Sequence, residues 1–219
     1  MGLRDAVMVE LWESIQPGET VLFERIGEGN LAFGLYQIIE WAAEKGFRVI
    51  IADVLDSYET MLSKMKLMGL DPGKLSGIEV IKIGGSKKFG RIIAHIEEIS
   101  EPMILSKKFK EAYEPIIADS SRRVLAVAVG IERLFAVSDI NIGGVQVIVS
   151  HLAGYVGRPN RLGIYLVKRG VLPKEREFLI NMLEDIATTV IKTEKKGRMT
   201  EFHIVKSVNR DLEGVLIRV

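Results

Sequence analysis

Residues 17–57 have the sequence PGETVLFERIGEGNLAFGLYQIIEWAAEKGFRVIIADVLDS, and this stretch decides the fold. The apolar run within residues 19–26 predicts a strand, and residues 27–30 form a glycine-containing turn. Residues 31–45 place apolar side chains at helical spacing and predict an amphipathic helix. Residues 47–54 are apolar almost throughout, which is typical of parallel strands that are buried on both faces. The stretch therefore predicts a strand–helix–strand unit of a parallel sheet.

The same alternation of strands and helices continues on both sides of this unit. We expect a first helix at 3–15, further helices at 56–68, 87–98, 107–117 and 173–185, and a helix-rich region at 131–152. We expect strands at 78–83, 122–130 and 162–167, a hairpin of 187–193 with 199–206, and a last strand at 214–219. Within 131–152, the residues Val145–Val149 leave a strand as an alternative.

These elements predict an α/β fold with three layers, α/β/α, around a mostly parallel sheet that ends in a C-terminal antiparallel hairpin. We expect one domain, composed of an N-terminal helix at 3–15, a core at 19–185, and a hairpin with a last strand at 186–219.

Composition excludes several classes of function. The 219 residues contain no cysteine, so disulfides, thiolate metal sites and cysteine nucleophiles are excluded. The formal net charge is +1, which gives no overall electrostatic attraction for nucleic acid or anionic lipid. The amino-terminal segment carries charges within its apolar stretch, unlike a signal peptide, and no run is long enough to span a membrane. We expect a cytoplasmic protein without membrane contact.

The turn after the first strand has the layout of a phosphate-binding loop. In the pattern G-x-x-x-x-G-K-[ST], backbone N–H groups surround the phosphates, a lysine reaches the terminal phosphates and a hydroxyl holds magnesium. Here Glu24 replaces the first glycine, Asn30 stands at the lysine position and Leu31 at the hydroxyl position. Glu28 adds a carboxylate that would repel a triphosphate. The candidate site is this degenerate loop, which consists of Gly27, Glu28, Gly29, Asn30 and Leu31.

The order of the elements resembles the RecA/KaiC superfamily of ATPases over about residues 14–210. Residues 17–57 resemble its strand, loop, helix and second strand. The segment KLMGLDPGKLSGIEVIKIGG at 66–85 resembles the following helix, turn and strand, and residues 164–209 resemble the final strand, helix and antiparallel hairpin. The chain looks most like a small family of unknown function from hyperthermophilic archaea, placed in this superfamily.

The resemblance also implies acidic residues that this chain lacks. A Walker B strand ends in an aspartate that helps hold magnesium, but here Val129 or Gly130 stands at that position, with no acid before Glu132. A glutamate pair after the second core strand activates water in KaiC-like proteins. Asp56 lies closest to one of those positions, and we interpret it as the cap of the helix that follows, as Ser57 could also be.

Other polar and aromatic residues have ordinary structural explanations. We expect His95, His151 and His203 to be plain helix or strand residues, because no metal-ligand spacing connects them. Four basic clusters could contact nucleic acid, but we expect them to be solvated faces and loops; they are Lys87-Lys88 with Arg91, Lys107-Lys108 with Lys110, Arg122-Arg123, and Arg158 with Arg161. Leu11 and Trp12 could pack on the domain or on a partner.

These observations predict a non-catalytic RecA/KaiC-like protein that acts through protein contacts, as a scaffold or regulatory subunit. The partner would be another protein or a second copy of the chain, and no cofactor is expected. One alternative is a nucleotide-binding protein or slow ATPase that uses ATP and magnesium in an altered loop. A second alternative is a DNA accessory factor, although the neutral total charge argues against nucleic acid as a partner.

Overall fold

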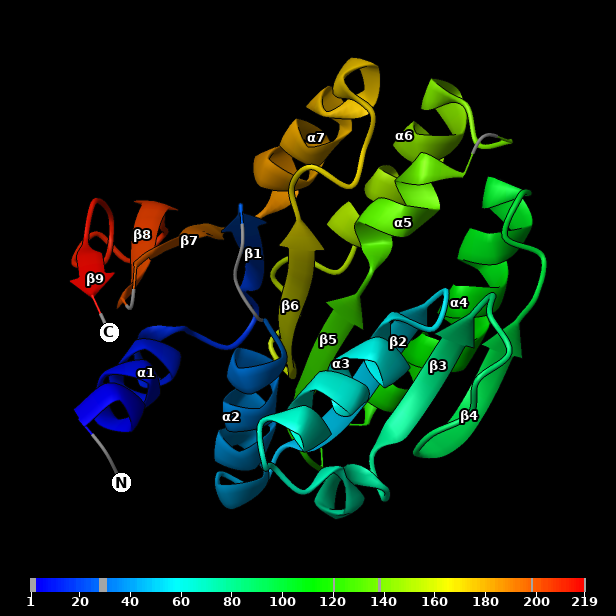
Figure 1. Cartoon of the computed structure of the whole chain (residues 1–219). Coiled ribbons are helices and arrows are strands. Elements are labelled where there is room, and N and C mark those ends of the chain that lie inside the picture. The colour runs from blue at the N-terminus through cyan, green and yellow to red at the C-terminus, as the bar shows by residue number, and fades with distance from the viewer. Residues whose placement is uncertain (1–2, 28–30, 120, 138, 198, 219) are drawn as a thin grey trace.

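The computed structural model describes residues 3–27, 31–119, 121–137, 139–197 and 199–218, with side chains from Met8 onward. A nine-stranded sheet forms the centre, in the order β4-β3-β2-β5-β6-β1-β7-β8-β9 (Figure 1). The strands are β1 (Thr20–Ile26), β2 (Arg48–Val54), β3 (Glu79–Ile83), β4 (Arg91–Ile96), β5 (Val124–Val129), β6 (Arg161–Lys168), β7 (Thr189–Lys196), β8 (Met199–Lys206) and β9 (Leu216–Arg218). Pairing is parallel from β4 to β7 and antiparallel from β7 to β9.

Helices cover both faces of the sheet, so the expected three layers are confirmed (Figure 1). The helices are α1 (Leu3–Ser14), α2 (Leu31–Glu44), α3 (Ser57–Leu67), α4 (Pro102–Ala118), α5 (Ile131–Ala136), α6 (Ile142–Ala153) and α7 (Phe178–Ile186), with short 3-10 turns at Pro72–Leu75 and Lys174–Arg176. None of these described helices is both long and apolar enough to cross a membrane.

Two hydrophobic cores lie on the two faces of the sheet. Helices α1, α2 and α3 pack on one face, and α4, α5, α6 and α7 pack on the other. Successive residues of a central strand alternate between the cores, since Ile50 joins one and Ile51 the other. Leu11 and Trp12 of α1 are buried in the first of these cores, which settles their packing on the domain itself.

The helix expected at 87–98 is wrong, because residues 91–96 form the edge strand β4. The connection from β3 to β4 contains no helix and turns at Gly84, Gly85 and Gly90, which all have positive φ. At Gly90 a Cβ atom would lie 2.7 Å from the carbonyl oxygen of Ile78, so only glycine fits beside β3. These glycines bring the chain back within seven residues and leave no room for a helix.

One alternative and two helix boundaries also differ from those expected. Val145–Val149 lies inside α6, so the alternative of a strand there is wrong. Helix α4 begins at Pro102, five residues before the expected start, because proline is well suited to the first helical turn. The segment after Pro173 forms a 3-10 turn first, and α7 begins at Phe178.

Candidate functional site

Gly27 and Leu31, the two described residues of the expected loop, lie at the carboxyl edge of the parallel strands, where open α/β sheets bind ligands. Gly27 follows β1 with φ 65°, a left-handed conformation that suits glycine, and Leu31 begins α2. Glu28, Gly29 and Asn30 lie outside the described residues. The described residues around this position are those at the carboxyl ends of β1, β2, β5 and β6.

Glu24 of β1 is fully buried beside this loop and belongs to a charged network. The Nε atom of Arg169 donates to Glu24 Oε2 at 2.5 Å, and the same guanidinium contacts Glu184 of α7. Lys192 of β7 adds a second cation at 3.0 Å from Glu184. Burial raises the pKa of Glu24, although Arg169 opposes this shift. Glu24, which stands at the first-glycine position of the loop, is thus paired with a cation of the protein itself.

Gly130 directly follows β5 and is, with Val129, one of the two positions where a Walker B acid would stand. It has φ 87°, and a side chain there would collide with the Ser57 side chain and lie 2.9 Å from the carbonyl oxygen of Val54. Ser57 itself donates to that carbonyl oxygen at 2.6 Å. The β2–α3 connection therefore occupies the space that an acidic side chain at residue 130 would need.

The substitution Gly130→Ala is expected to lower the free energy of unfolding by roughly 2–3 kcal/mol, because the left-handed backbone and the collision both add cost. Gly170→Ala is the matched control, since Gly170 has φ 80° and open space around its Cα. We expect about 1 kcal/mol for this control. Urea unfolding measures both, and equal losses would show that the contact with Ser57 has no energetic weight.

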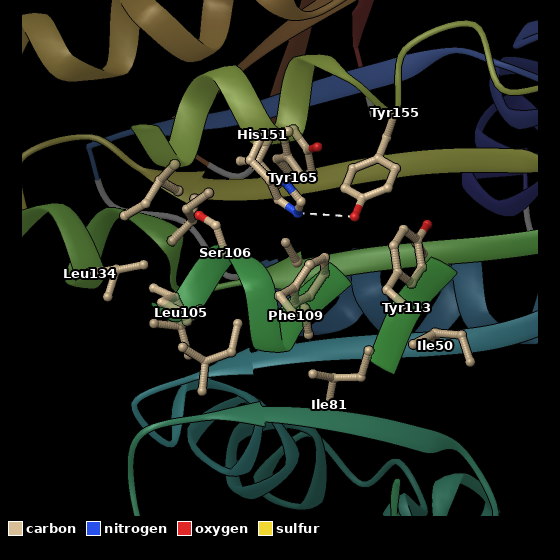
Figure 2. A pocket seen from close by; sticks show the side chains of 18 of the residues that line it. Ile50, Ile81, Leu105, Ser106, Phe109, Tyr113, Leu134, His151, Tyr155 and Tyr165 are labelled. Atoms are coloured by element: carbon tan, nitrogen blue, oxygen red, sulfur yellow. Dashed lines mark hydrogen bonds between the residues drawn. The ribbon is translucent and has the colours of Figure 1, made fainter. Parts of the chain in front are cut away.

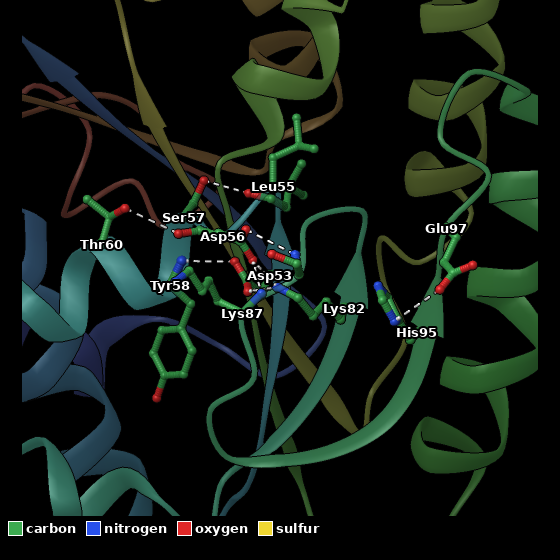
Figure 3. A network of polar contacts seen from close by, with 12 residues as sticks. Asp53, Leu55, Asp56, Ser57, Tyr58, Thr60, Lys82, Lys87, His95 and Glu97 are labelled. Carbon is green, nitrogen blue, oxygen red and sulfur yellow. Dashed lines mark hydrogen bonds and ion pairs between the residues drawn. The ribbon is translucent and has the colours of Figure 1, made fainter.

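A second network joins the carboxyl ends of β2 and β3 (Figure 3). The Lys82 ammonium is fully buried and donates to Asp53 Oδ2 at 2.9 Å and to Asp56 Oδ1 at 2.5 Å. Asp56 also accepts the backbone N–H groups of Ser86 and Lys87 at 3.1 and 2.9 Å. Lys82 therefore joins the loop after β2 to strand β3, and Asp56 joins the same loop to the loop after β3.

Asp56 does not cap α3, so that interpretation is wrong. Its side chain makes no hydrogen bond to the first turn of the helix, and its φ of 60° directs it toward Lys82 instead. The N–H of Tyr58 in the first turn donates to Asp53 Oδ1 at 2.9 Å. Asp53, three residues before Asp56, therefore accepts a hydrogen bond from one of the N–H groups that have no partner within the helix at its amino terminus.

The ionic network changes the acid–base behaviour of its members. Burial alone would raise the pKa of Asp56, but hydrogen bonds from Lys82 and from two backbone N–H groups outweigh it and lower the pKa. For Lys82, burial favours the neutral form, whereas the hydrogen bonds to Asp56 and Asp53 raise its pKa. Lys82 and Asp56 are therefore both charged near neutral pH.

The substitution Asp56→Asn should make the free energy of unfolding depend less on pH in the acid range. A carboxyl whose pKa is lower in the folded state stabilises above its unfolded pKa, and this contribution is lost as the pH falls through the folded pKa. Unfolding free energies measured between about pH 7 and pH 2 should therefore converge for the wild type and Asp56→Asn as acidity increases. The exposed Asp211→Asn is the control, and a variant curve parallel to the wild type would contradict the expectation.

A recess of about 80 Å³ lies between the start of α2, helix α3, and the ends of β5 and β6. Its lining includes four cationic residues and two hydroxyl residues, which are Arg25, Lys64, Arg133, Lys168, Ser57 and Thr60. Buried Glu132 also borders it, and its Oε2 atom has no hydrogen-bond partner among the described residues. Burial raises the pKa of Glu132, although backbone N–H groups oppose the shift. The cations of this recess could attract an anion, and Glu132 adds one buried carboxyl group.

Three of the four basic clusters contain a residue that is paired with an acid. Arg91 contacts Glu79, Lys108 lies 2.5 Å from Glu98, and Arg158 lies 3.9 Å from Glu114. Arg161 is a different case, because it is 2% exposed and not part of a solvated loop as expected. Its guanidinium donates to hydroxyl and carbonyl oxygens of four residues, which are Tyr113, Thr20, Tyr155 and Tyr165.

The histidines lie in regular elements, as expected. His95 is in β4, His151 in α6 and His203 in β8. Among the residues that the structure describes, no three His, Asp or Glu side chains gather as metal ligands would.

Sequence reasoning missed several members of this edge. Lys82 stands inside the apolar run EVIKI, and a charged residue at the centre of a buried strand is a signal for an internal partner. Arg169 and Glu184 are 15 residues apart, and no local pattern connects either of them with Glu24.

Comparisons with known proteins identify the fold and the family. The Pyrococcus horikoshii protein PH0250 is similar with a TM-score of 0.80 and 24% identity, over 96% of this chain and 97% of that one. The flagellar accessory protein FlaH from Methanocaldococcus jannaschii gives a TM-score of 0.59 at 16% identity, over 94% and 86%. A KaiC-like protein from Pyrococcus horikoshii gives 0.57 at 14% identity, over 92% and 84%.

These likenesses show a RecA/KaiC-like fold. Among curated proteins, none matches the chain. The family model described as Pyrococcus protein of unknown function, DUF257, matches residues 10–218. Since this match spans nearly the whole sequence, the chain belongs to that archaeal family.

Proposed function

We propose that this protein is a non-catalytic RecA/KaiC-like accessory protein that acts by binding other proteins. The observation that carries the proposal is the pairing of three acidic residues with the protein's own cations at the carboxyl edge of the sheet. Glu24 is held by Arg169, and Asp53 and Asp56 are held by Lys82. In a magnesium nucleotide site, acidic groups at this edge would instead be directed at metal and water.

The steric arrangement supports the same proposal. Two residues could stand where a magnesium ligand at the end of β5 would be: Val129 is apolar and buried, and Gly130 has no side chain, with Ser57 in the space that one would need. The residues present therefore do not fit magnesium-bound ATP in the way that the superfamily holds it. The likeness to FlaH, which is described as an accessory protein, agrees with a role of this kind.

Exposed apolar side chains on adjacent helices offer a surface for a protein partner. Met103 and Ile104 in the first turn of α4, Ile142 at the start of α6 and Phe178 at the start of α7 are 70%, 44%, 52% and 43% exposed. The starts of α4 and α6 are in contact, since a Cβ on Gly144 would lie 2.7 Å from Pro102. Exposed large apolar groups that cluster are typical of binding surfaces.

Two measurements test the proposal. Equilibrium dialysis with labelled ATP, with and without magnesium, measures nucleotide binding. A phosphate-release assay measures hydrolysis and should show none above background. Tagged protein returned to its native host should co-purify a partner that is lost in Met103→Ser/Phe178→Ser. Leu67→Ser is the control, because Leu67 is 88% exposed on α3, on the other face of the sheet. ATP turnover that disappears in Asp56→Asn would contradict the proposal.

The recess beside α2 favours a second candidate, a protein that binds a nucleotide or phosphate without turning it over. Lys64, Arg133 and Lys168 line it, and the helix start at Leu31 adds positive potential. In the same dialysis experiment this function predicts ATP binding that does not require magnesium and weakens in Lys64→Met/Lys168→Met. The exposed Lys45→Met/Lys74→Met, distant from the recess, should bind as the wild type does.

A further inference from the structure

An apolar cavity of about 60 Å³ lies between the sheet and helices α4 and α6 (Figure 2). Its floor consists of Ala52 in β2 and of Ala126 and Ala128 in β5. Leu105 and Phe109 of α4 lie on the helical side. The cavity lies on the face opposite α2 and α3 and is separate from the carboxyl-edge site described above.

Small residues at the centre of the sheet create this space. Ala52 and Ala128 are register partners on adjacent strands, and Ala126 pairs with Gly163 of β6. Strands β2 and β5 are flanked by strands on both sides and covered by helices, a position that normally buries every side chain. All three alanines nevertheless remain partly accessible, because nothing fills the volume above them.

Polar groups around the cavity are engaged with one another. The hydroxyl of Tyr155 and Nε2 of His151 are 3.0 Å apart, and burial lowers the pKa of His151, which favours the neutral ring. The hydroxyls of Tyr113 and Tyr165 accept from the buried Arg161. The surface exposed to the cavity is almost entirely carbon. The lining can therefore stabilise an apolar group but offers little to a charge.

The approach to the cavity runs between two helices. Ser106 of α4 and His151 of α6 both line it, and both are partly exposed on facing helices. The ring of Phe109 lies 6.3 Å from that of His151. Side chains of two helices therefore border the cavity on this side.

We propose that this cavity is a binding site for a small neutral apolar molecule or the apolar end of a larger one. On this measure one water needs roughly 10–15 Å³, so the space exceeds a single-water defect. Water is a poor occupant because the walls provide no hydrogen bonds, and apolar cavities of this kind stay dry and accept gases or hydrocarbons. The proposal does not depend on the proposed function, because the cavity and the carboxyl-edge site are supported by different observations.

Methyl-resolved NMR of the intact chain tests the proposal with xenon, cyclopropane and acetate as ligands. Xenon and cyclopropane should cause saturable shifts of methyl groups at the cavity, such as Ile50, Ile81 and Leu105. Methyl groups of the opposite core, such as Ile51 and Ile164, should not respond. Acetate, which is similar in size but charged, should produce no saturable shift at the cavity.

Two alanine substitutions provide the matched comparison. Ala126→Val places two methyl groups into the space and should abolish the xenon shifts, with thermal stability equal to or above that of the wild type. Ala94→Val is the same change in β4, away from the cavity lining, and should leave the shifts intact. Absence of saturable xenon and cyclopropane shifts in the wild type would overturn the proposal, as would binding that persists in a folded Ala126→Val. Preferred binding of acetate would overturn the assignment to a neutral ligand.

Discussion

Replacing Lys82 with methionine is expected to lower the free energy of unfolding by about 3–5 kcal/mol, because removal of one partner leaves buried charge uncompensated. Lys82 is fully buried, and its ammonium is bonded to both Asp53 and Asp56. The variant keeps the volume and apolar stem of the side chain but leaves two carboxylates facing each other. Chemical unfolding of the wild type and variant measures the difference.

Two further variants define the origin of this loss. Lys45→Met breaks an ion pair with Glu13 in which both side chains are about half exposed, and it should cost no more than about 1 kcal/mol. Adding Asp53→Asn to Lys82→Met should recover part of the stability, since one of the two stranded charges is then removed. A Lys82→Met variant as stable as the Lys45→Met control would show that the buried network contributes nothing.

Replacing Arg161 with methionine should cost about 3–5 kcal/mol, since each buried polar group left without its partner costs about 1–3 kcal/mol. The guanidinium donates to the hydroxyls of Tyr113, Thr20 and Tyr165 and to the carbonyl of Tyr155. Among the described residues no carboxylate pairs with it, so these neutral oxygens hold the charge. Thermal and urea unfolding measure the change.

The shape of the guanidinium should matter more than its charge. Arg161→Lys keeps a cation, but its donors spread from one point and cannot reach four oxygens in different directions, so we expect little recovery over methionine. Arg158→Met, three residues away and exposed, is the control and should cost no more than about 1 kcal/mol. Full stability in Arg161→Lys would show that charge alone suffices.

Much of the fold can be predicted from the sequence, because the central elements carry strong local patterns. The apolar runs at 20–26, 48–54 and 124–129 are strands, and the helix over 31–44 lies where its amphipathic pattern predicts it. The antiparallel hairpin of β7 and β8 is also confirmed. Each of these elements can be predicted from its own segment alone, since the period of its apolar residues is visible among residues that are adjacent in sequence.

Strand β4 could not be predicted in this way. Its residues Arg91–Ile96 lie at the edge of the sheet and are mostly partly exposed, so the alternation of a half-buried strand is weak. The glycines that force the short connection act through contacts with β3, which a single segment does not reveal.

The ionic contacts of the site escaped prediction for a related reason. Asp56 has a sufficient local explanation as a helix cap, whereas its actual partner Lys82 is 26 residues away. Arg161 follows a loop rich in polar residues, and its partner Tyr113 is 48 residues away. Local propensity cannot distinguish a solvated charge from one buried by distant strands.

The position of β1 in the sheet has a consequence for how the chain reaches its native state. β1 precedes every other described strand of the sheet in the sequence, yet its neighbours on both sides, β6 and β7, follow β2, β3, β4 and β5. Thr20 contacts Arg161 across 141 residues and Thr188 across 168. During translation the sheet can therefore begin from β2, β3, β4 and β5, while the first strand must wait unpaired until the carboxyl-terminal third has left the ribosome.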